Sequence, residues 1–248
     1  MELEKKICII TGAAKGVGRA TSLRFSREGA VVVLVDILEK ELRELAERIH
    51  DSGQESVTMR ADLSDSHDIR RAVERTMNQF GRIDVLVNNA GIVGPTKKSW
   101  EIQEEEWDRV FGVNLKSVYH FCRFVAPLMI ARKDGKIINV ASIAGKEGNE
   151  NLAAYSASKA GVACFSRVLA KEVAALGIRV NSIAPALIET DLVKEMPKEQ
   201  VEFLLNKIPL RRLGRPEEVA ELILFLASDR SSFITGQCFN VTGGRGDY

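Results

Sequence analysis

The sequence is poor in the residues that build disulfide frameworks, metal centres and membrane spans. Its 248 residues include four widely spaced cysteines without a Cys-x-x-Cys pair, and only three scattered histidines. These counts argue against a zinc site and favour buried thiols in a reducing compartment. No apolar run approaches the roughly 18–20 residues that a membrane span needs, and the charged N-terminus resembles neither a signal nor a transit peptide. We therefore expect a cytoplasmic protein without a metal.

The sequence also lacks an excess of positive or negative charge. Lysine and arginine number 35 against 34 aspartates and glutamates, so the formal net charge is +1. This balance gives no indication of a nucleic-acid or membrane-surface partner. The apolar fraction of 45% and the charged fraction of 28% are typical of a globular protein and exclude a disordered or fibrous one.

Short apolar runs alternate along the chain with longer amphipathic ones. The predicted strands are Ile7–Thr11, Val31–Asp36, Ser56–Ala61, Val85–Asn88, Lys136–Ser142, Arg179–Ala184 and Cys238–Val241. The predicted helices are Val17–Glu28, Glu39–Asp51, Ser66–Phe80, a long stretch over Glu104–Arg132, Ala153–Leu176 and Pro216–Ala227. Continuously apolar strands between helices are typical of a parallel sheet that is covered on both faces. We predict an α/β fold: a single domain over residues 1–248 with one doubly wound sheet of about seven strands.

The segment Leu187–Leu213 interrupts this alternation. It is charged and contains two prolines, which suits a helical excursion over the sheet edge better than a layer of the sheet. We predict that it forms a mobile substrate lid.

Three glycines follow the first strand and open the first helix. In the run Thr11–Gly18, Gly12 suits a tight turn, Gly16 lets the backbone approach a pyrophosphate, and Gly18 permits close helix–strand packing. The N–H groups at the helix start, including that of Val17, would bind phosphate. A glycine cluster alone often marks only a turn, but here a strand precedes it and a helix follows it.

Asp36 ends the second predicted strand, where a carboxylate can accept hydrogen bonds from the adenosine ribose. The alternative is a solvated carboxylate in a turn. A carboxylate here would repel the 2′-phosphate of NADP, and Ile37 adds no positive charge. Lys15 could attract that phosphate or merely face solvent. We therefore predict NAD as the preferred cofactor, with NADP as the alternative.

Two further strand ends carry candidate cofactor contacts. Asp62 could bind the adenine amino group while Leu63 covers the ring. The alternative is that Asp62 only caps the following helix, but Ser64 or Ser66 is better placed to be that cap. After the fourth strand, Asn88 is followed by Asn89, Ala90 and Gly91. Adjacent buried amides need hydrogen-bond partners, so they stabilise the sheet, line the cofactor ribose, or do both.

Tyr155 and Lys159 are four residues apart in a helix, so a phenol and an ammonium share one face. Such a pair is usually exposed, but this helix is rich in alanine and other apolar residues, which is unusual for a solvated helix. Ser142 ends the preceding strand. The pattern therefore indicates that the phenol and the ammonium are buried together rather than solvated.

Together these motifs resemble the short-chain dehydrogenase/reductase family in its form of about 250 residues, over nearly the whole chain. The resemblance implies a Rossmann-like sheet and hydride transfer between a nicotinamide and a carbonyl or alcohol carbon. It implies that Tyr155 is the general acid/base and that Ser142 binds the substrate oxygen. It also implies that Lys159 lowers the pKa of the Tyr155 phenol and binds the nicotinamide ribose. Asn114, a polar residue in an apolar helix, would hold a water that relays protons to Lys159; the other interpretation is a side-chain bond at a helix bend.

The resemblance extends to a nicotinamide-binding loop at Pro185–Thr190. Thr190 and the backbone of Ile188 would bind the carboxamide, and Pro185 begins the motif. Ala186 stands where the family usually has glycine. A positive φ at an alanine costs about 1 kcal/mol. Either the loop has shifted or Ala186 has an ordinary conformation.

Two other functions compete with an NAD(P)-dependent oxidoreductase: a methyltransferase and a non-catalytic dinucleotide-binding protein. For the substrate, the polar run Gly145–Asn149 favours a sugar, sugar acid or polyol, with a 3-oxoacyl-carrier-protein reductase as the alternative. Apolar residues spread around the helices 115–130 and 153–176 predict a two-fold contact, and the family implies a homotetramer.

Overall fold

The computed structural model describes residues 1–194, 196 and 198–246. Seven parallel strands form one sheet in the order β3-β2-β1-β4-β5-β6-β7. The strands are β1 (Ile7–Thr11), β2 (Val31–Asp36), β3 (Ser56–Arg60), β4 (Val85–Asn88), β5 (Gly135–Val140), β6 (Ile178–Pro185) and β7 (Cys238–Val241). The predicted doubly wound parallel sheet is confirmed, and the strand bounds differ from prediction by at most two residues.

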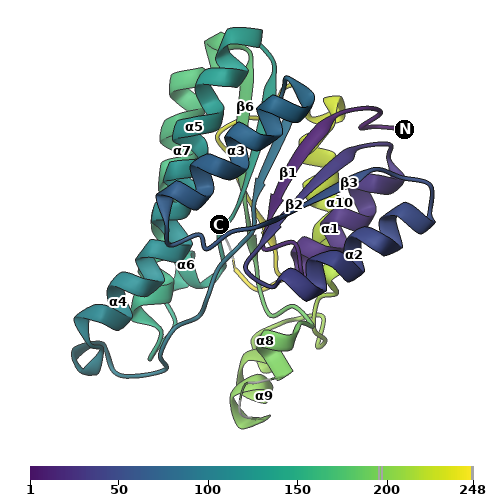
Figure 1. Cartoon of the computed structure of the whole chain (residues 1–248). Coiled ribbons are helices and arrows are strands. Elements are labelled where there is room, and N and C mark those ends of the chain that lie inside the picture. The colour runs from purple at the N-terminus through teal and green to yellow at the C-terminus, as the bar shows by residue number, and fades with distance from the viewer. Residues whose placement is uncertain (195, 197, 247–248) are drawn as a thin grey trace.

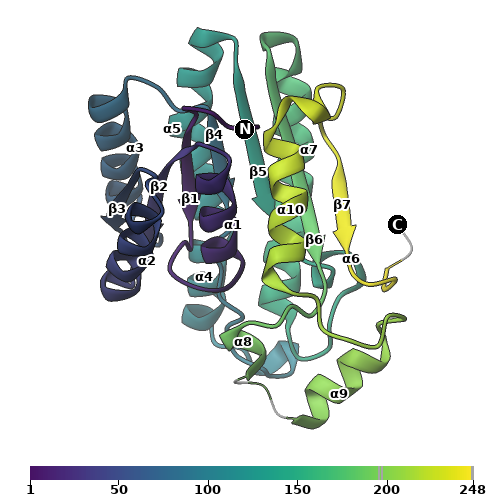
Figure 2. The same ribbon diagram turned by 90° about the vertical axis from the view of Figure 1, so that its right-hand side faces the viewer.

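Helices cover both faces of the sheet (Figures 1 and 2). One face carries α1 (Gly16–Arg27), α2 (Glu39–Asp51) and α10 (Pro216–Ala227), whose residues Phe25, Leu45 and Ile223 share one core cluster. The other face carries α3 (Ser66–Phe80), α5 (Ser117–Arg132) and α7 (Ala153–Val173), with a second core cluster.

The strand sequences explain the two cores. In β1, Ile7 and Ile9 pack into one cluster, whereas Cys8 and Ile10 pack into the other. The same alternation recurs in β2. Because successive side chains of a strand point to opposite faces, only a continuously apolar strand can supply both cores.

The long predicted helix over Glu104–Arg132 is divided. It consists of α4 (Glu104–Phe111), a π-helical turn over Gly112–Lys116, and α5. The predicted helix Ala153–Leu176 comprises α7 and a short 3-10 turn over Ala174–Leu176. A short helix, α6 (Ala144–Glu147), joins β5 to α7.

The segment predicted as a lid contains two helices, α8 (Asp191–Lys194) and α9 (Lys198–Asn206). Figures 1 and 2 place them beyond the carboxyl ends of the strands rather than over a sheet edge. Ile188 forms a parallel bridge to Gly214, so the two ends of the excursion meet at its base. Residues 195 and 197 of the predicted lid lie outside the described residues.

Candidate active site

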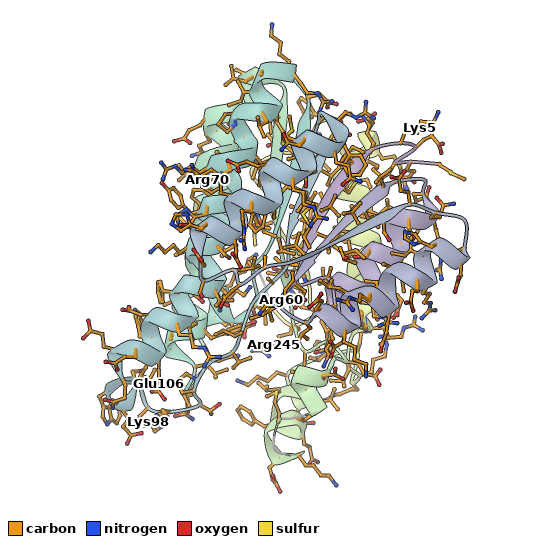
Figure 3. The ribbon with its side chains drawn as sticks, viewed as in Figure 1. Lys5, Arg60, Arg70, Lys98, Glu106 and Arg245 are labelled. Atoms are coloured by element: carbon orange, nitrogen blue, oxygen red, sulfur yellow. The ribbon has the colours of Figure 1, made fainter. Side chains whose placement is uncertain are left out.

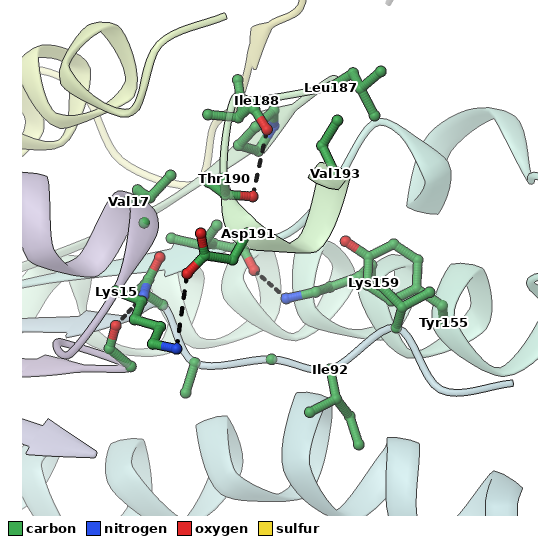
Figure 4. A pocket seen from close by; sticks show the side chains of 18 of the residues that line it. Lys15, Val17, Ile92, Tyr155, Lys159, Leu187, Ile188, Thr190, Asp191 and Val193 are labelled. Carbon is green, nitrogen blue, oxygen red and sulfur yellow. Dashed lines mark hydrogen bonds and ion pairs between the residues drawn. The ribbon is translucent and has the colours of Figure 1, made fainter. Parts of the chain in front are cut away.

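A cleft of about 710 Å³ opens at the carboxyl ends of the strands. Chain segments far apart in the sequence meet around it, including the glycine-rich turn, the start of α7 and α8 (Figure 4). Most of the predicted cofactor-binding residues line it: Gly12, Lys15, Gly16, Val17, Asp36, Ile37, Asn89, Ala90, Gly91, Tyr155, Lys159, Pro185, Ile188 and Thr190.

The glycine-rich turn is a cradle that larger residues would fill. Gly12 and Gly16 have φ values of +63° and +53°, which side chains rarely adopt. A Cβ atom at Gly12 would lie 2.9 Å from Ala90 Cα, and one at Gly18 would lie 2.0 Å from Gly12 O. Lys15, the N-cap of α1, makes no side-chain cap hydrogen bond, and the first turn of α1 has no acidic residue. This geometry fits a bound pyrophosphate.

Asp36 lines the cleft beside the glycine-rich turn, which its carboxylate supports. Its Oδ2 atom accepts from Ala14 N and its Oδ1 atom from Leu38 N, both at 3.1 Å. The nearby Lys15 ammonium lies 3.8 Å from carboxylate oxygens of both Glu41 and Asp191. The positive charge of Lys15 is therefore already balanced, which weakens its attraction for a further phosphate.

Asp62 and Leu63 do not line this cleft. Asp62 accepts from the backbone N and the hydroxyl of Ser64, and these hydrogen bonds lower the pKa of its carboxyl group. Leu63 packs into the core beneath α3. The cap of α3 is Asp65, which accepts from His67 N at 2.8 Å, rather than Ser64 or Ser66.

The two adjacent asparagines have different partners. Asn89 Nδ2 donates to the carbonyls of Thr11 and Gly12, at 3.0 and 3.1 Å, and so joins the end of β4 to the glycine-rich turn. Asn88 is buried and donates to Asn139 Oδ1 at 2.8 Å. Asn88 thus ties strands together, whereas Asn89 shapes the cleft.

Asn114 lies in the π-helical turn and has no exposed surface. Its Oδ1 accepts from Ile92 N at 2.8 Å, while its Nδ2 donates to Ile92 O and to Ser158 Oγ. A Cβ atom at Gly91 would lie 3.1 Å from Lys159 Nζ and 3.2 Å from Asn114 Oδ1, so these three residues meet. The predicted hydrogen bond of the Asn114 side chain at an irregular helical turn is therefore present, and it lies beside Lys159. Such π-turns are frequent at functional sites.

Tyr155 and Lys159 project from the first turns of α7 into the cleft (Figure 4). Lys159 is 4% exposed and its Nζ donates to Val140 O at 2.8 Å. Burial lowers the pKa of this ammonium to about 8, since no carboxylate offsets the lost hydration. The Nζ atom lies 6.0 Å from the centre of the Tyr155 ring.

Ser142 follows β5 and is buried. Burial raises the pKa of the Tyr155 phenol above its ordinary value, and a hydrogen bond with Ser142 partly opposes the rise. This direction is opposite to the lowered pKa that the resemblance implies. The protein alone therefore keeps the phenol protonated, in the form that can donate a proton.

The loop after β6 resolves the alternatives for Ala186. The described non-glycine residues with positive φ are Lys5, Lys133, Asn151 and Arg211, so Ala186 has an ordinary conformation. Its N–H donates to Val241 O at 3.0 Å. Farther along the loop, Thr190 Oγ1 donates to Ile188 O at 3.4 Å (Figure 4).

The rest of the cleft is mainly apolar, and most of its lining was not predicted from the sequence. Its lining includes Ile92, Val93, Thr96, Asn149, Leu152, Leu187, Val193, Met196 and Leu204. Of the polar run Gly145–Asn149, only Asn149 lines the cleft. Lys146 donates to Cys238 O, and Glu147 pairs with Arg245. These long-range partners leave no signal in the local sequence.

Neither a membrane-spanning helix nor a metal site is found among the described residues. No helix within the described parts of the chain is both long and apolar enough to span a membrane. Among the same residues, no three histidine, cysteine, aspartate or glutamate side chains gather closely enough to hold a metal ion.

Comparison with known proteins adds independent findings. A family model described as "Enoyl-(Acyl carrier protein) reductase" matches residues 12–245. A 3-oxoacyl-[acyl-carrier-protein] reductase of Thermotoga maritima is 45% identical, over 98% of this chain and 99% of that protein. A 2-dehydro-3-deoxy-L-rhamnonate dehydrogenase (NAD(+)) of Sphingomonas is 37% identical, over 97% and 95%. The crystal structure of gox2181 is 33% identical, with a TM-score of 0.95, and the match covers 98% of this chain and 96% of that one.

Proposed function

The chain belongs to the short-chain dehydrogenase/reductase family and is an NAD(P)-dependent oxidoreductase of alcohols and ketones, and we propose that the described cleft is its active site. Family membership removes the methyltransferase and the non-catalytic alternatives. The observation that carries the proposal is the convergence, in one cleft, of a glycine cradle with Tyr155 and a buried Lys159.

A nicotinamide cofactor, when bound, supplies or accepts the hydride at the substrate carbon. The glycine cradle, the uncapped start of α1 and Asp36 fit its phosphates and ribose. Thr190 and Ile188 also line the cleft, where they suit the carboxamide. Thr190 lies close to the glycine-rich turn, since a Cβ atom at Gly16 would lie 3.0 Å from its Cγ2 atom.

In the reduction of a ketone, Tyr155 donates its phenolic proton to the substrate oxygen, and Ser142 holds that oxygen in place. Lys159 stabilises the phenolate that forms, because an ammonium with a pKa of about 8 is mainly charged at pH 7. Asn114 fixes the backbone of Ile92 and the position of Ser158, so it keeps the floor of this site rigid. A water held between Asn114 and Lys159 would return the proton.

The adenosine end favours NAD over NADP. Asp36 presents a carboxylate where a 2′-phosphate would lie, and Lys15 is engaged by Glu41 and Asp191. Ile37 is exposed and adds no positive charge.

For the substrate, the apolar lining supports a ketone attached to an apolar chain, such as a 3-oxoacyl group. A sugar acid is the second candidate, which the dehydrogenase of Sphingomonas and the polar side chain of Asn149 support. This order reverses the preference that the local sequence suggested, because Lys146 and Glu147 face other partners.

We also propose a homotetramer in the cytoplasm. Tyr119 of α5 and Val168 of α7 are 43% and 47% exposed, and Leu176 adds to the same apolar face. A shallow groove of about 390 Å³ runs between the two helices. The proposal of a second two-fold contact rests on the edge strand β7 and on the resemblance to the family.

The proposal of a cytoplasmic location rests on the four free cysteines.

Purified enzyme with NADH or NADPH and a panel of 3-oxoacyl thioesters, simple ketones and keto sugar acids tests the function. We expect turnover with NADH and the highest kcat/KM for a 3-oxoacyl thioester. A preference for keto sugar acids would favour the second candidate. No turnover of any carbonyl compound with either cofactor would contradict the assignment of the site.

A further inference from the structure

The last described turn of the chain places a guanidinium beside the substrate end of the cleft. Arg245 follows β7 and is 5% exposed. Its Nε and Nη2 atoms donate to Glu147 Oε2 at 3.0 and 2.8 Å, and Nη2 also donates to Asn149 Oδ1 at 3.0 Å. In the view of Figure 3, Arg245 lies near the carboxyl ends of the strands, and Figure 2 places the turn after β7 at the outer side of the sheet.

These contacts determine which way the Asn149 amide points. A guanidinium has only donors, so the amide atom facing Arg245 must be the oxygen. Turning the amide over would bring its NH2 group against Arg245 and break the bond. The Glu147 carboxylate in turn fixes the position of the guanidinium, and Glu147 is itself the last residue of α6.

The backbone of Asn149 is fixed as well. Its N–H donates to Ser156 Oγ at 3.2 Å, and its carbonyl accepts from Leu152 N at 3.2 Å. Ser156 directly follows Tyr155 in α7, so Asn149 is tied to the same turn of helix as the proposed acid. No acceptor for Asn149 Nδ2 is found among the residues that the structure describes. Its two N–H donors therefore remain for a molecule in the cleft that Asn149 lines.

We propose that Asn149 is a specificity-determining residue that donates a hydrogen bond to a second oxygen of the substrate, and that Arg245 is the positioning residue that orients it. The proposal rests on the proposed function. It narrows the substrate class to ketones that carry another acceptor oxygen close to the reacting carbonyl, beside an otherwise apolar chain. A thioester carbonyl one methylene away meets this description.

Asn149→Asp is the sharpest test because its carboxylate keeps an acceptor toward Arg245 and loses both donors. The probes are S-acetoacetyl-N-acetylcysteamine, which has the second oxygen, and 2-heptanone, which lacks it. For the thioester we expect KM to rise at least about tenfold with kcat within about threefold. For 2-heptanone we expect no change in kcat/KM.

Arg245 is tested by Arg245→Met and Arg245→Lys. The methionine variant should raise the KM for the thioester about threefold to tenfold, and the lysine variant should restore part of the loss. Lys146→Met is the matched control, because Lys146 lies on the same helix as Glu147 and donates to Cys238 O. It should leave the KM for the thioester unchanged.

A thioester KM within about twofold of wild type in Asn149→Asp would overturn the proposal. So would equal losses on both ketones, or a fall in kcat and melting temperature without a change in KM, since these point to a merely structural role. If the wild type does not reduce 2-heptanone, the change in the KM for the thioester in Asn149→Asp alone decides whether the proposal stands. If it reduces neither ketone with NADH or NADPH but oxidises an alcohol, the inferred substrate class is wrong and the family's chemistry stands. No turnover of any substrate would contradict the proposed function itself.

Discussion

Buried charged side chains lie at both ends of the parallel sheet, but their partners differ. At the amino end they pair with opposite charges, whereas at the carboxyl end Arg245 pairs with Glu147 but Lys159 faces only a carbonyl oxygen. Asp84, which is 1% exposed, precedes β4 and accepts from Ile7 N and from Arg132, each at 2.8 Å. Lys136 is the second residue of β5, and its Nζ atom lies 2.8 Å from Asp134 Oδ1. At the carboxyl end, Lys159 is buried against a carbonyl oxygen, and no carboxylate among the described residues pairs with it.

This difference separates stability from chemistry. A buried charge with a charged partner is kept in one protonation state and holds strands together. A buried ammonium without one has a pKa near neutrality and a field that is free to act on a neighbouring phenol. The carboxyl end therefore gives up folding free energy at Lys159 for a proton-transfer site, whereas the paired charges at the amino end do not.

The largest expected effect is at the carboxyl end. Tyr155→Phe keeps the ring and removes the proton carrier, so kcat should fall at least about a hundredfold while NADH binding stays within a few-fold. Single-turnover kinetics and NADH fluorescence measure the two quantities. A variant that kept more than about a tenth of the wild-type kcat would show that Tyr155 is not the acid.

The converse change is at the amino end. Asp84→Asn removes the carboxylate from Arg82 and Arg132, which are both partly solvated, and weakens the hydrogen bond from Ile7 N. The free energy of unfolding should therefore fall by about 2 kcal/mol, while the kcat of the folded enzyme stays within about twofold. Urea unfolding followed by tryptophan fluorescence tests this. Arg71→Ala is the control, because it breaks the exposed pair with Asp68 and should cost less than about 1 kcal/mol. A large loss of kcat in Asp84→Asn would show that the two ends are coupled.

A smaller effect concerns the cofactor. Asp36→Ala should shift the ratio of kcat/KM for NADPH over NADH upward by about tenfold or more, since like charges no longer oppose the 2′-phosphate. Lys15→Met should change that ratio by less than about threefold, because Glu41 and Asp191 already balance the lysine. Wild-type enzyme with equal kcat/KM for both cofactors would indicate that Asp36 does not select.

The smallest expected effect is in the segment Leu187–Leu213. Its helices α8 and α9 project beyond the sheet and are joined at the base by the Ile188–Gly214 bridge (Figure 2). We expect faster amide exchange there than in β1 or β4 without NADH, and slower exchange with it. Equal protection in both states would remove the lid hypothesis.

How far the sequence predicts each region depends on where the decisive contacts come from. The strands follow from local apolar runs, and the glycine-rich turn follows from the strand and helix that flank it. The π-helical turn at Gly112–Lys116 does not, because Asn114 is held by Ile92, which is 22 residues away. The amphipathic pattern alone predicts an uninterrupted helix there.

The outer helix faces show the same limit. Val118, Phe121 and Val125 appear in the sequence as part of an apolar surface, but the structure buries them against the sheet. The exposed part of that surface is therefore smaller than the composition suggests. Likewise, Lys146 and Glu147 resemble substrate ligands until their partners in β7 and the C-terminal turn are known. In each case a long-range contact determines where the side chain lies.

The stability of Lys159→Met relative to wild type tests the central claim most directly. Burial lowers the pKa of Lys159 from 10.5 to about 8, so the unfolded chain binds more protons between these values, and native stability rises with pH across them. Below pH 8 the burial costs up to about 3 kcal/mol, less about 1 kcal/mol for the bond to Val140 O. Urea unfolding at pH 7 should therefore find the inactive methionine variant more stable than wild type by about 2 kcal/mol, with the gap shrinking from pH 8 to 10. A variant less stable than wild type at pH 7 would contradict the claim that the carboxyl end gives up stability for its chemistry.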